Sequence, residues 1–117
     1  MKKYLLFTVL TVLLLSANSS AGTADFSDTC ATLSLIGPDA DPGEGYSIEA
    51  TGKVNSGYSY YAWFYIDGVY NSYSYSFFST SFTRKYGPFT GPHTFKVTMQ
   101  GGGAMNLCKR SVELTVA

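Results

Sequence analysis

Apolar and polar residues alternate along most of the chain, and a period of two predicts β-strands. The alternation is clearest at residues 31–35, 46–51, 94–99 and 111–116. Glycine, proline and aspartate gather between these runs, as in the turn-forming stretch 37–45. Past the first twenty residues no run of even ten has apolar positions at helical spacing. The chain therefore reads as all-β.

The middle of the chain adds two further strands joined by a tight turn. Residues 58–66 are apolar on both faces and end at Asp67-Gly68, one of the strongest hairpin signals. The partner strand, 69–77, alternates tyrosine with serine, and at Phe77-Phe78 the alternation shifts by one residue, which predicts a bulge or a corner. After 78–82, the segment 84–88 is expected to end the next strand. Six or seven strands at this spacing favour a two-sheet antiparallel sandwich.

The first residues have the pattern of an export signal. A positive start at 1–3 is followed by an apolar run at 4–15 and a small-residue exit at 16–21. A membrane anchor is the alternative, but about twelve apolar residues fall short of the roughly twenty that span a bilayer. We expect residues 1–21 to be a secretory signal peptide cut after Ala21, residues 22–117 to form one domain, and the product to be secreted or periplasmic and not membrane-anchored.

Charge and cysteine content narrow the class further. The 117 residues hold 8 basic and 8 acidic side chains, and this balance offers no basic excess for nucleic acid. Cys30 and Cys108 are the 2 cysteines, and in an exported chain they favour one disulfide closing a loop of about 79 residues. Free thiols or half of a metal site are the alternatives, although zinc takes about four ligands and His93 is the only histidine.

Three short motifs resemble those of bacterial immunoglobulin-like and PKD-type domains. They are a Pro-Gly turn before a strand at 42–52, a tryptophan and an Asp-Gly at 63–68, and a Phe-x-Val pattern at 94–98. The resemblance implies an immunoglobulin-like sandwich with Trp63 in the core and Phe64 facing outward. In such a sandwich the first and last strands can run side by side in the same direction, which would bring Cys30 and Cys108 together.

Residues suited to catalysis or metal binding are few and scattered. His93 stands between Pro92 and Thr94, and a Ser-His-Asp arrangement would need distant residues to converge. Paired carboxylates could cleave glycosides, but the sequence disperses Glu44, Glu49, Asp67 and Glu113 over turns and outward strand positions. Asp39, Asp41 and Glu44 could begin a calcium site, yet turns of this composition are common without an ion. We expect no enzyme, no cofactor and no metal.

Aromatic residues are unusually dense in the middle of the chain. Because neighbouring residues on a strand point to opposite faces, one sandwich interior cannot hold all of them. Between Tyr58 and Phe89 they are Tyr58, Tyr60, Tyr61, Trp63, Phe64, Tyr65, Tyr70, Tyr73, Tyr75, Phe77, Phe78, Phe82, Tyr86 and Phe89.

Three interpretations of these rings compete. They can stabilise a small sheet through cross-strand pairs, form a binding platform for glycan or protein surfaces, or mark an edge strand that pairs with a copy of itself in an extracellular assembly. We favour a secreted binding or adhesion module whose contact surface is Tyr58, Tyr60, Phe64, Tyr70, Tyr73 and Tyr75. A weaker alternative is a hydrolase inhibitor acting through the loop at 52–57 or at 101–103.

Overall fold

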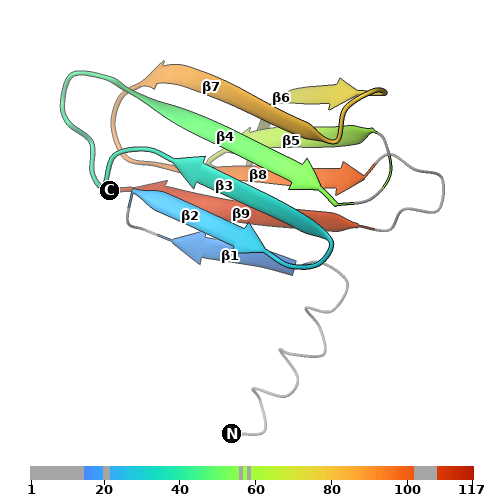
Figure 1. The fold of residues 1–117 in the computed structure, drawn as a ribbon. Coiled ribbons are helices and arrows are strands. Elements are labelled where there is room, and N and C mark those ends of the chain that lie inside the picture. The colour runs from blue at the N-terminus through green and yellow to red at the C-terminus, as the bar shows by residue number, and fades with distance from the viewer. Residues whose placement is uncertain (1–14, 20–21, 56, 58, 102–107) are drawn as a thin grey trace, which may run out of the picture.

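Two antiparallel β-sheets pack face to face in the structure, a computed structural model that describes residues 15–19, 22–55, 57, 59–101 and 108–117 (Figure 1). The sheet that we call the β4 sheet has the strand order β2-β3-β4-β7. The other, the β5 sheet, has the order β9-β8-β5-β6. The strands are β2 (Thr23–Ser27), β3 (Ala31–Ile36), β4 (Tyr46–Val54), β5 (Tyr60–Ile66), β6 (Val69–Ser76), β7 (Ser81–Phe89), β8 (His93–Gly101) and β9 (Lys109–Val116). The predicted all-β two-sheet sandwich is confirmed.

A further short strand, β1 (Leu15–Ser19), runs parallel to β9 at the margin of the β5 sheet. It lies within the segment that the sequence marks as a signal peptide. Cleavage after Ala21 would remove β1 and leave β9 as that margin of the sheet.

The core lies between the two sheets and follows the alternation in the sequence. On β3 and β4 every second residue is buried, including Leu33, Leu35 and Ile48. Gly52 continues this inward series within β4, so its prediction as the start of a loop is wrong. A Cβ on Gly52 would lie 2.6 to 2.8 Å from side-chain atoms of Phe82, Leu33 and Met99. Any residue other than glycine would therefore force these three side chains to move.

The turns around β5 and β6 form as the sequence indicates. Asp67 and Gly68 both have positive φ, 52° and 82°, as a two-residue hairpin of this kind requires. Beyond β6 the chain turns at Phe77-Phe78 and crosses from the β5 sheet to the β4 sheet, which confirms the predicted corner. The next strand does not stop at 84–88, because β7 continues through Pro88 to Phe89.

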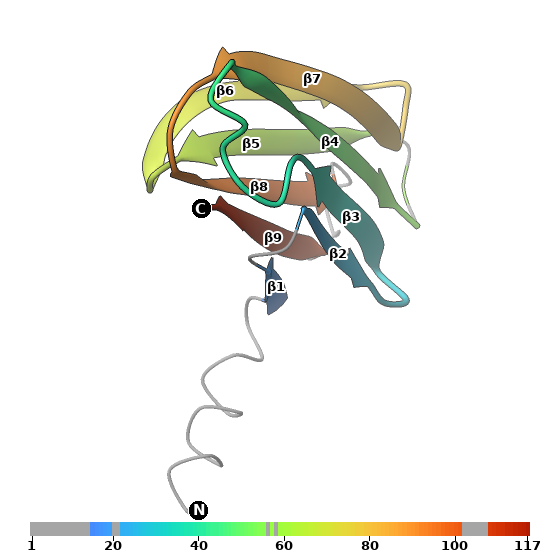
Figure 2. The ribbon, with the colours of Figure 1, turned by 90° about the vertical axis from the view of Figure 1, so that its left-hand side faces the viewer.

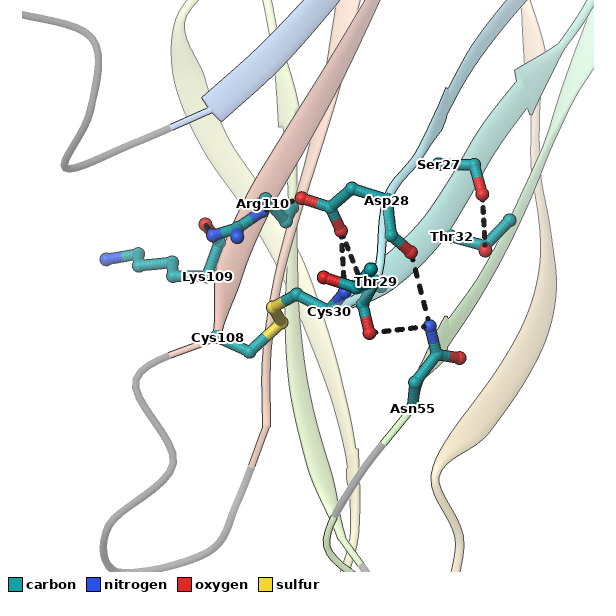
Figure 3. A network of polar contacts seen from close by, with 10 residues as sticks. Ser27, Asp28, Thr29, Cys30, Thr32, Asn55, Cys108, Lys109 and Arg110 are labelled. Carbon is teal, nitrogen blue, oxygen red and sulfur yellow. Dashed lines mark hydrogen bonds and ion pairs between the residues drawn. A yellow bond between two sulfur atoms is a disulfide. The ribbon is translucent and has the colours of Figure 1, made fainter.

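The cysteines form the predicted disulfide, with Cα atoms 5.8 Å apart. The bond connects the two sheets, because Cys30 precedes β3 and Cys108 precedes β9 (Figure 3). The expectation that these two strands are neighbours is therefore wrong: they belong to opposite sheets and pack against each other across the core, with their starting ends joined by the disulfide (Figure 2).

Asp28 orders the segment around this disulfide. Its Oδ1 accepts hydrogen bonds from the N–H groups of Cys30 and Ala31. Its Oδ2 accepts a hydrogen bond of 2.8 Å from Nε of Arg110, which belongs to the facing sheet (Figure 3). Burial opposes ionisation, but the Ala31 N–H and the Arg110 guanidinium outweigh it and lower the pKa of Asp28. The carboxylate therefore helps the disulfide to hold the two sheets together.

Candidate functional site

The direction of the β5 side chains decides which rings reach solvent. Phe64 points into the core and is only 1% exposed, whereas Trp63 points to the outer side. The expectation of a buried Trp63 and an outward Phe64 is therefore reversed. Phe64 stacks on Tyr86 of the opposite sheet, with ring centroids 3.9 Å apart and planes within 4°. With Phe64 held in this way, the alternation of the strand sends Trp63 outward.

Tyr60 also belongs to the core and not to the predicted contact surface. It is 5% exposed, its ring stacks on Phe82 at 5.3 Å, and its hydroxyl shares a hydrogen bond of 2.8 Å with Ser74 Oγ. The remaining predicted contact residue of this strand region, Tyr58, lies outside the described residues.

The outer side of β5 and β6 carries a continuous set of exposed or half-exposed rings, which we call the aromatic face. As predicted, Tyr70, Tyr73 and Tyr75 lie at the surface, 52%, 55% and 48% exposed. The β5 rings that complete the set were not among the predicted contact residues, which included Tyr60 and Phe64 from this strand instead. The aromatic face consists of Tyr61, Trp63, Tyr65, Tyr70, Tyr73, Tyr75 and Phe77.

Strand register places these rings side by side across the sheet. Tyr61 is opposite Tyr75, Trp63 is opposite Tyr73, and Tyr65 is opposite Tyr70. Four of the rings also share nearly one orientation. The planes of Tyr61 and Trp63 differ by 19°, those of Tyr61 and Tyr75 by 24°, and those of Tyr73 and Tyr75 by 14°, with centroids 5.6 to 6.2 Å apart. The rings therefore stack on one another as a set and do not stand apart.

Two lysines from the neighbouring strands extend over this face. Lys96 Nζ lies 4.9 Å from the Tyr65 ring centroid, and Lys109 Nζ lies 5.7 Å from that of Trp63. Both distances are within the range of cation–π attraction. The β8–β9 side of the aromatic face thus carries Lys96 and Lys109, with Glu113 directly opposite Lys96. With phenol hydroxyls among its rings, the face suits partners that present polar groups over a flat apolar surface.

The tyrosine–serine alternation of β6 places its small residues inward and its rings outward. Ser74 faces inward and is buried, while Tyr73 and Tyr75 on either side of it face outward. A strand built for the core alone would place its large side chains inside. On β6 the large side chains lie on the solvent side instead, so an exposed aromatic cluster covers this face of the sheet.

Asp67 and His93 are brought together, a pairing that sequence reasoning did not foresee. His93 Nδ1 lies 2.7 Å from Asp67 Oδ2, and His93 Nε2 lies 2.9 Å from the carbonyl oxygen of Thr90. Both partners are acceptors, so the geometry fits a doubly protonated imidazole. The Asp67 carboxylate raises the pKa of His93, and the Thr94 N–H together with His93 lowers the pKa of Asp67. With both ring nitrogens engaged in this way, the pair ties the β5–β6 turn to the start of β8.

In the acidic turn considered for calcium, the two carboxylate oxygens of Asp41 accept hydrogen bonds from backbone N–H groups. Asp41 Oδ1 accepts the N–H of Gly43, and its Oδ2 accepts the N–H of Gly91. Within the described ranges, no group of three or more histidine, cysteine, aspartate or glutamate residues is arranged to hold a metal ion. Glu49 and Glu113 lie on different sheets, and no helix in the described part of the chain has the length and apolarity to cross a membrane.

Comparisons of the chain with protein-family models, with curated proteins and with solved structures gave no match.

Proposed function

We propose that this protein is an exported binding or adhesion module that holds glycan or extracellular protein surfaces on its aromatic face. The observation that carries the proposal is the set of large rings, about half exposed on β6, gathered on one side of one sheet. Monomeric soluble proteins seldom expose contiguous apolar surface unless a partner covers it. Tyrosine and tryptophan are also the side chains that contribute most to such contacts.

Export is supported by two independent features. The positive start, apolar run and small-residue exit of residues 1–21 have the pattern of a cleaved signal peptide. The Cys30–Cys108 disulfide fits an oxidising extracellular or periplasmic compartment. An exported module that is held by a disulfide and carries rings on one face suits work outside the cytoplasm.

The resemblance to immunoglobulin-like and PKD-type domains belongs to this proposal only at the level of architecture. In an immunoglobulin constant domain the second strand pairs with the fifth. In this chain β3 pairs with β4, the next strand along the sequence, and β4 then pairs with β7. The likeness supports the two-sheet sandwich and says nothing of a role or a ligand.

A second candidate function is a structural subunit of an extracellular assembly. It is favoured by the place of the tyrosine–serine strand, since β6 is an edge strand of its sheet. The loop-based inhibitor has less support, because Gly52 is buried within β4 and Gly101 within β8, so both of the loops considered for it begin inside strands.

Depletion of the protein from solution tests the proposal. The exported protein is incubated with a panel of insoluble polysaccharides and with immobilised extracellular proteins, beside the double variant Tyr73→Ser/Tyr75→Ser. Phe78→Ser is the matched control, because Phe78 is 95% exposed but lies outside the aromatic face. We expect depletion by one class of surface, lost in the double variant and kept in the control. Equal depletion of all three proteins, or none of the wild type by any surface, would refute the proposal.

A further inference from the structure

The margins of the two sheets differ in how they are protected. Edge strands expose unpaired backbone groups, and proteins guard them with charges, proline or short length. In the β4 sheet, β2 is only 5 residues long and carries Asp25, and β7 carries Arg84, Lys85 and Pro88. In the β5 sheet, β9 carries Lys109, Arg110 and Glu113, and β1 covers its outer edge by parallel pairing. Charge, proline, short length or a covering strand therefore protects three of the margins.

The fourth margin, β6, lacks charge and proline. Its 8 residues, Val69–Ser76, include no charged side chain and no proline. Among the described strands it pairs only with β5. Its one irregularity is a bulge at Asn71, since Phe64 pairs with Ser72 and Tyr65 pairs with Tyr70, and beyond it Ser72–Ser76 pairs regularly. An uncharged edge with a regular stretch is the kind that a further strand joins.

The side chains of β6 leave its backbone edge accessible to a further strand. Ser74 Oγ is hydrogen-bonded to Tyr60 in the core, and the rings of Tyr73 and Tyr75 stack on each other 5.6 Å apart. Both rings stand on the outer face, away from the line along which a new strand would add. An added strand would therefore meet the backbone without displacing either ring.

We propose that a second copy of this chain joins β6 antiparallel to its own β6 and closes a twofold dimer. Self-pairing is favoured because the strand is uncharged and so meets no repulsion from its copy. When two copies of the same strand pair antiparallel, each residue lies opposite one residue of the other copy. An outward residue then lies opposite another outward residue only if their two residue numbers add up to an even number. A register centred on Ser74 satisfies this rule within the regular segment: Tyr73 lies opposite Tyr75, and Ser72 lies opposite Ser76.

The dimer follows from the symmetry of that edge. A contact in which the same strand serves both copies is complete after two chains, and the other margin of the sheet, at β9, takes no part in it. The two β5 sheets become one continuous sheet, and the two aromatic faces become one surface of doubled width. The dimer is independent of what the aromatic face binds.

Sedimentation equilibrium of the exported, disulfide-containing protein tests the proposal. We expect a monomer–dimer equilibrium between about 1 μM and about 1 mM, with no larger species. Tyr73→Lys/Tyr75→Lys puts like charges opposite one another across the axis and should weaken the dimer at least about tenfold. Thr83→Lys, an exposed position on β7, is the matched control and should leave the dimer unchanged. Circular dichroism shows that each variant is folded.

Cross-linking tests the register. Tyr73→Cys and Tyr75→Cys chains, mixed and treated with a short thiol-specific cross-linker, should join faster than either variant alone. A monomer throughout the concentration range, an open-ended polymer, unchanged dimerisation of the double lysine variant, or equal cross-linking in all three samples would overturn the inference. A monomer that is still depleted by a surface would overturn the dimer and leave the proposed function standing.

Discussion

Replacing Phe64 and Trp63 separately by alanine measures which face of β5 lies in the core. Phe64 is 1% exposed and stacks on Tyr86, so Phe64→Ala removes a filled core position. Such a truncation costs about 3–5 kcal/mol. Trp63 packs only against the outer side of the sheet, near Tyr61 and Lys109. At about 25 cal/mol per Å² of lost apolar burial, we expect Trp63→Ala to cost about 1–2 kcal/mol.

Urea unfolding of the oxidised protein, followed by far-ultraviolet circular dichroism, gives both values. Fluorescence is unsuitable because Trp63 is the only tryptophan. A domain of this size has a free energy of unfolding of about 5–14 kcal/mol, so Phe64→Ala should move the midpoint strongly toward low urea while Trp63→Ala moves it little. A larger loss of stability for Trp63→Ala than for Phe64→Ala would show that the strand faces the other way, and the aromatic face as described would not exist.

Three further measurements examine other parts of the account. Reducing the disulfide, or replacing both Cys30 and Cys108 by serine, should lower the free energy of unfolding by roughly 4.5 kcal/mol on the chain-entropy model for its loop of about 79 residues; a loss below about 1 kcal/mol in urea unfolding would contradict it. Gly52→Ala should cost about 1–3 kcal/mol, since the new methyl group would overlap core side chains, and unchanged thermal stability would mean that the core is looser than described. The Asp67 carboxylate raises the pKa of His93. An NMR titration of this single histidine should therefore give a pKa above the ordinary value of 6.5. The stability from this pair is therefore complete between about pH 4, above which Asp67 is ionised, and about pH 6.5, and it is lost as the pH rises through the raised pKa of His93. The wild type should lose stability over that rise relative to His93→Gln, and parallel pH profiles for the two proteins would refute the pairing.

The strands and turns could be predicted because each depends on local chemistry. Alternation alone fixed the inward series of β3 and β4, and Asp67-Gly68 fixed the hairpin through its positive φ angles. The parity shift at Phe77-Phe78 likewise fixed the passage between sheets. In each of these segments the signal lies within a few residues and does not depend on distant partners.

The orientation of β5 could not be predicted in the same way, because both of its faces are apolar. With Tyr61, Trp63 and Tyr65 on one side and Phe64 on the other, alternation identifies two sets but not which one is buried. The choice depends on Tyr86, 22 positions away from Phe64, whose ring fits against that of Phe64. The pairing of Asp67 with His93 was missed for the same reason, since it joins a turn to a distant strand.

The order of the strands in the two sheets also could not be predicted from the sequence. The strands after Cys30 and before the chain end were expected side by side but lie in opposite sheets. Alternation shows that a strand has a buried face, and it does not show which sheet contains that face. The disulfide prediction held because it depended only on the starting ends of the two strands meeting.

Nitration of tyrosines by tetranitromethane, located by mass spectrometry, tests the aromatic face most directly. The chain offers internal references, since Tyr46 and Tyr60 are buried while Tyr70, Tyr73 and Tyr75 are about half exposed. We expect the three β6 tyrosines to react first in the native protein and the two buried ones to react only on unfolding. Slow reaction of Tyr73 and Tyr75 in the monomer, at the rate of Tyr46 and Tyr60, would contradict the surface on which the proposed function depends.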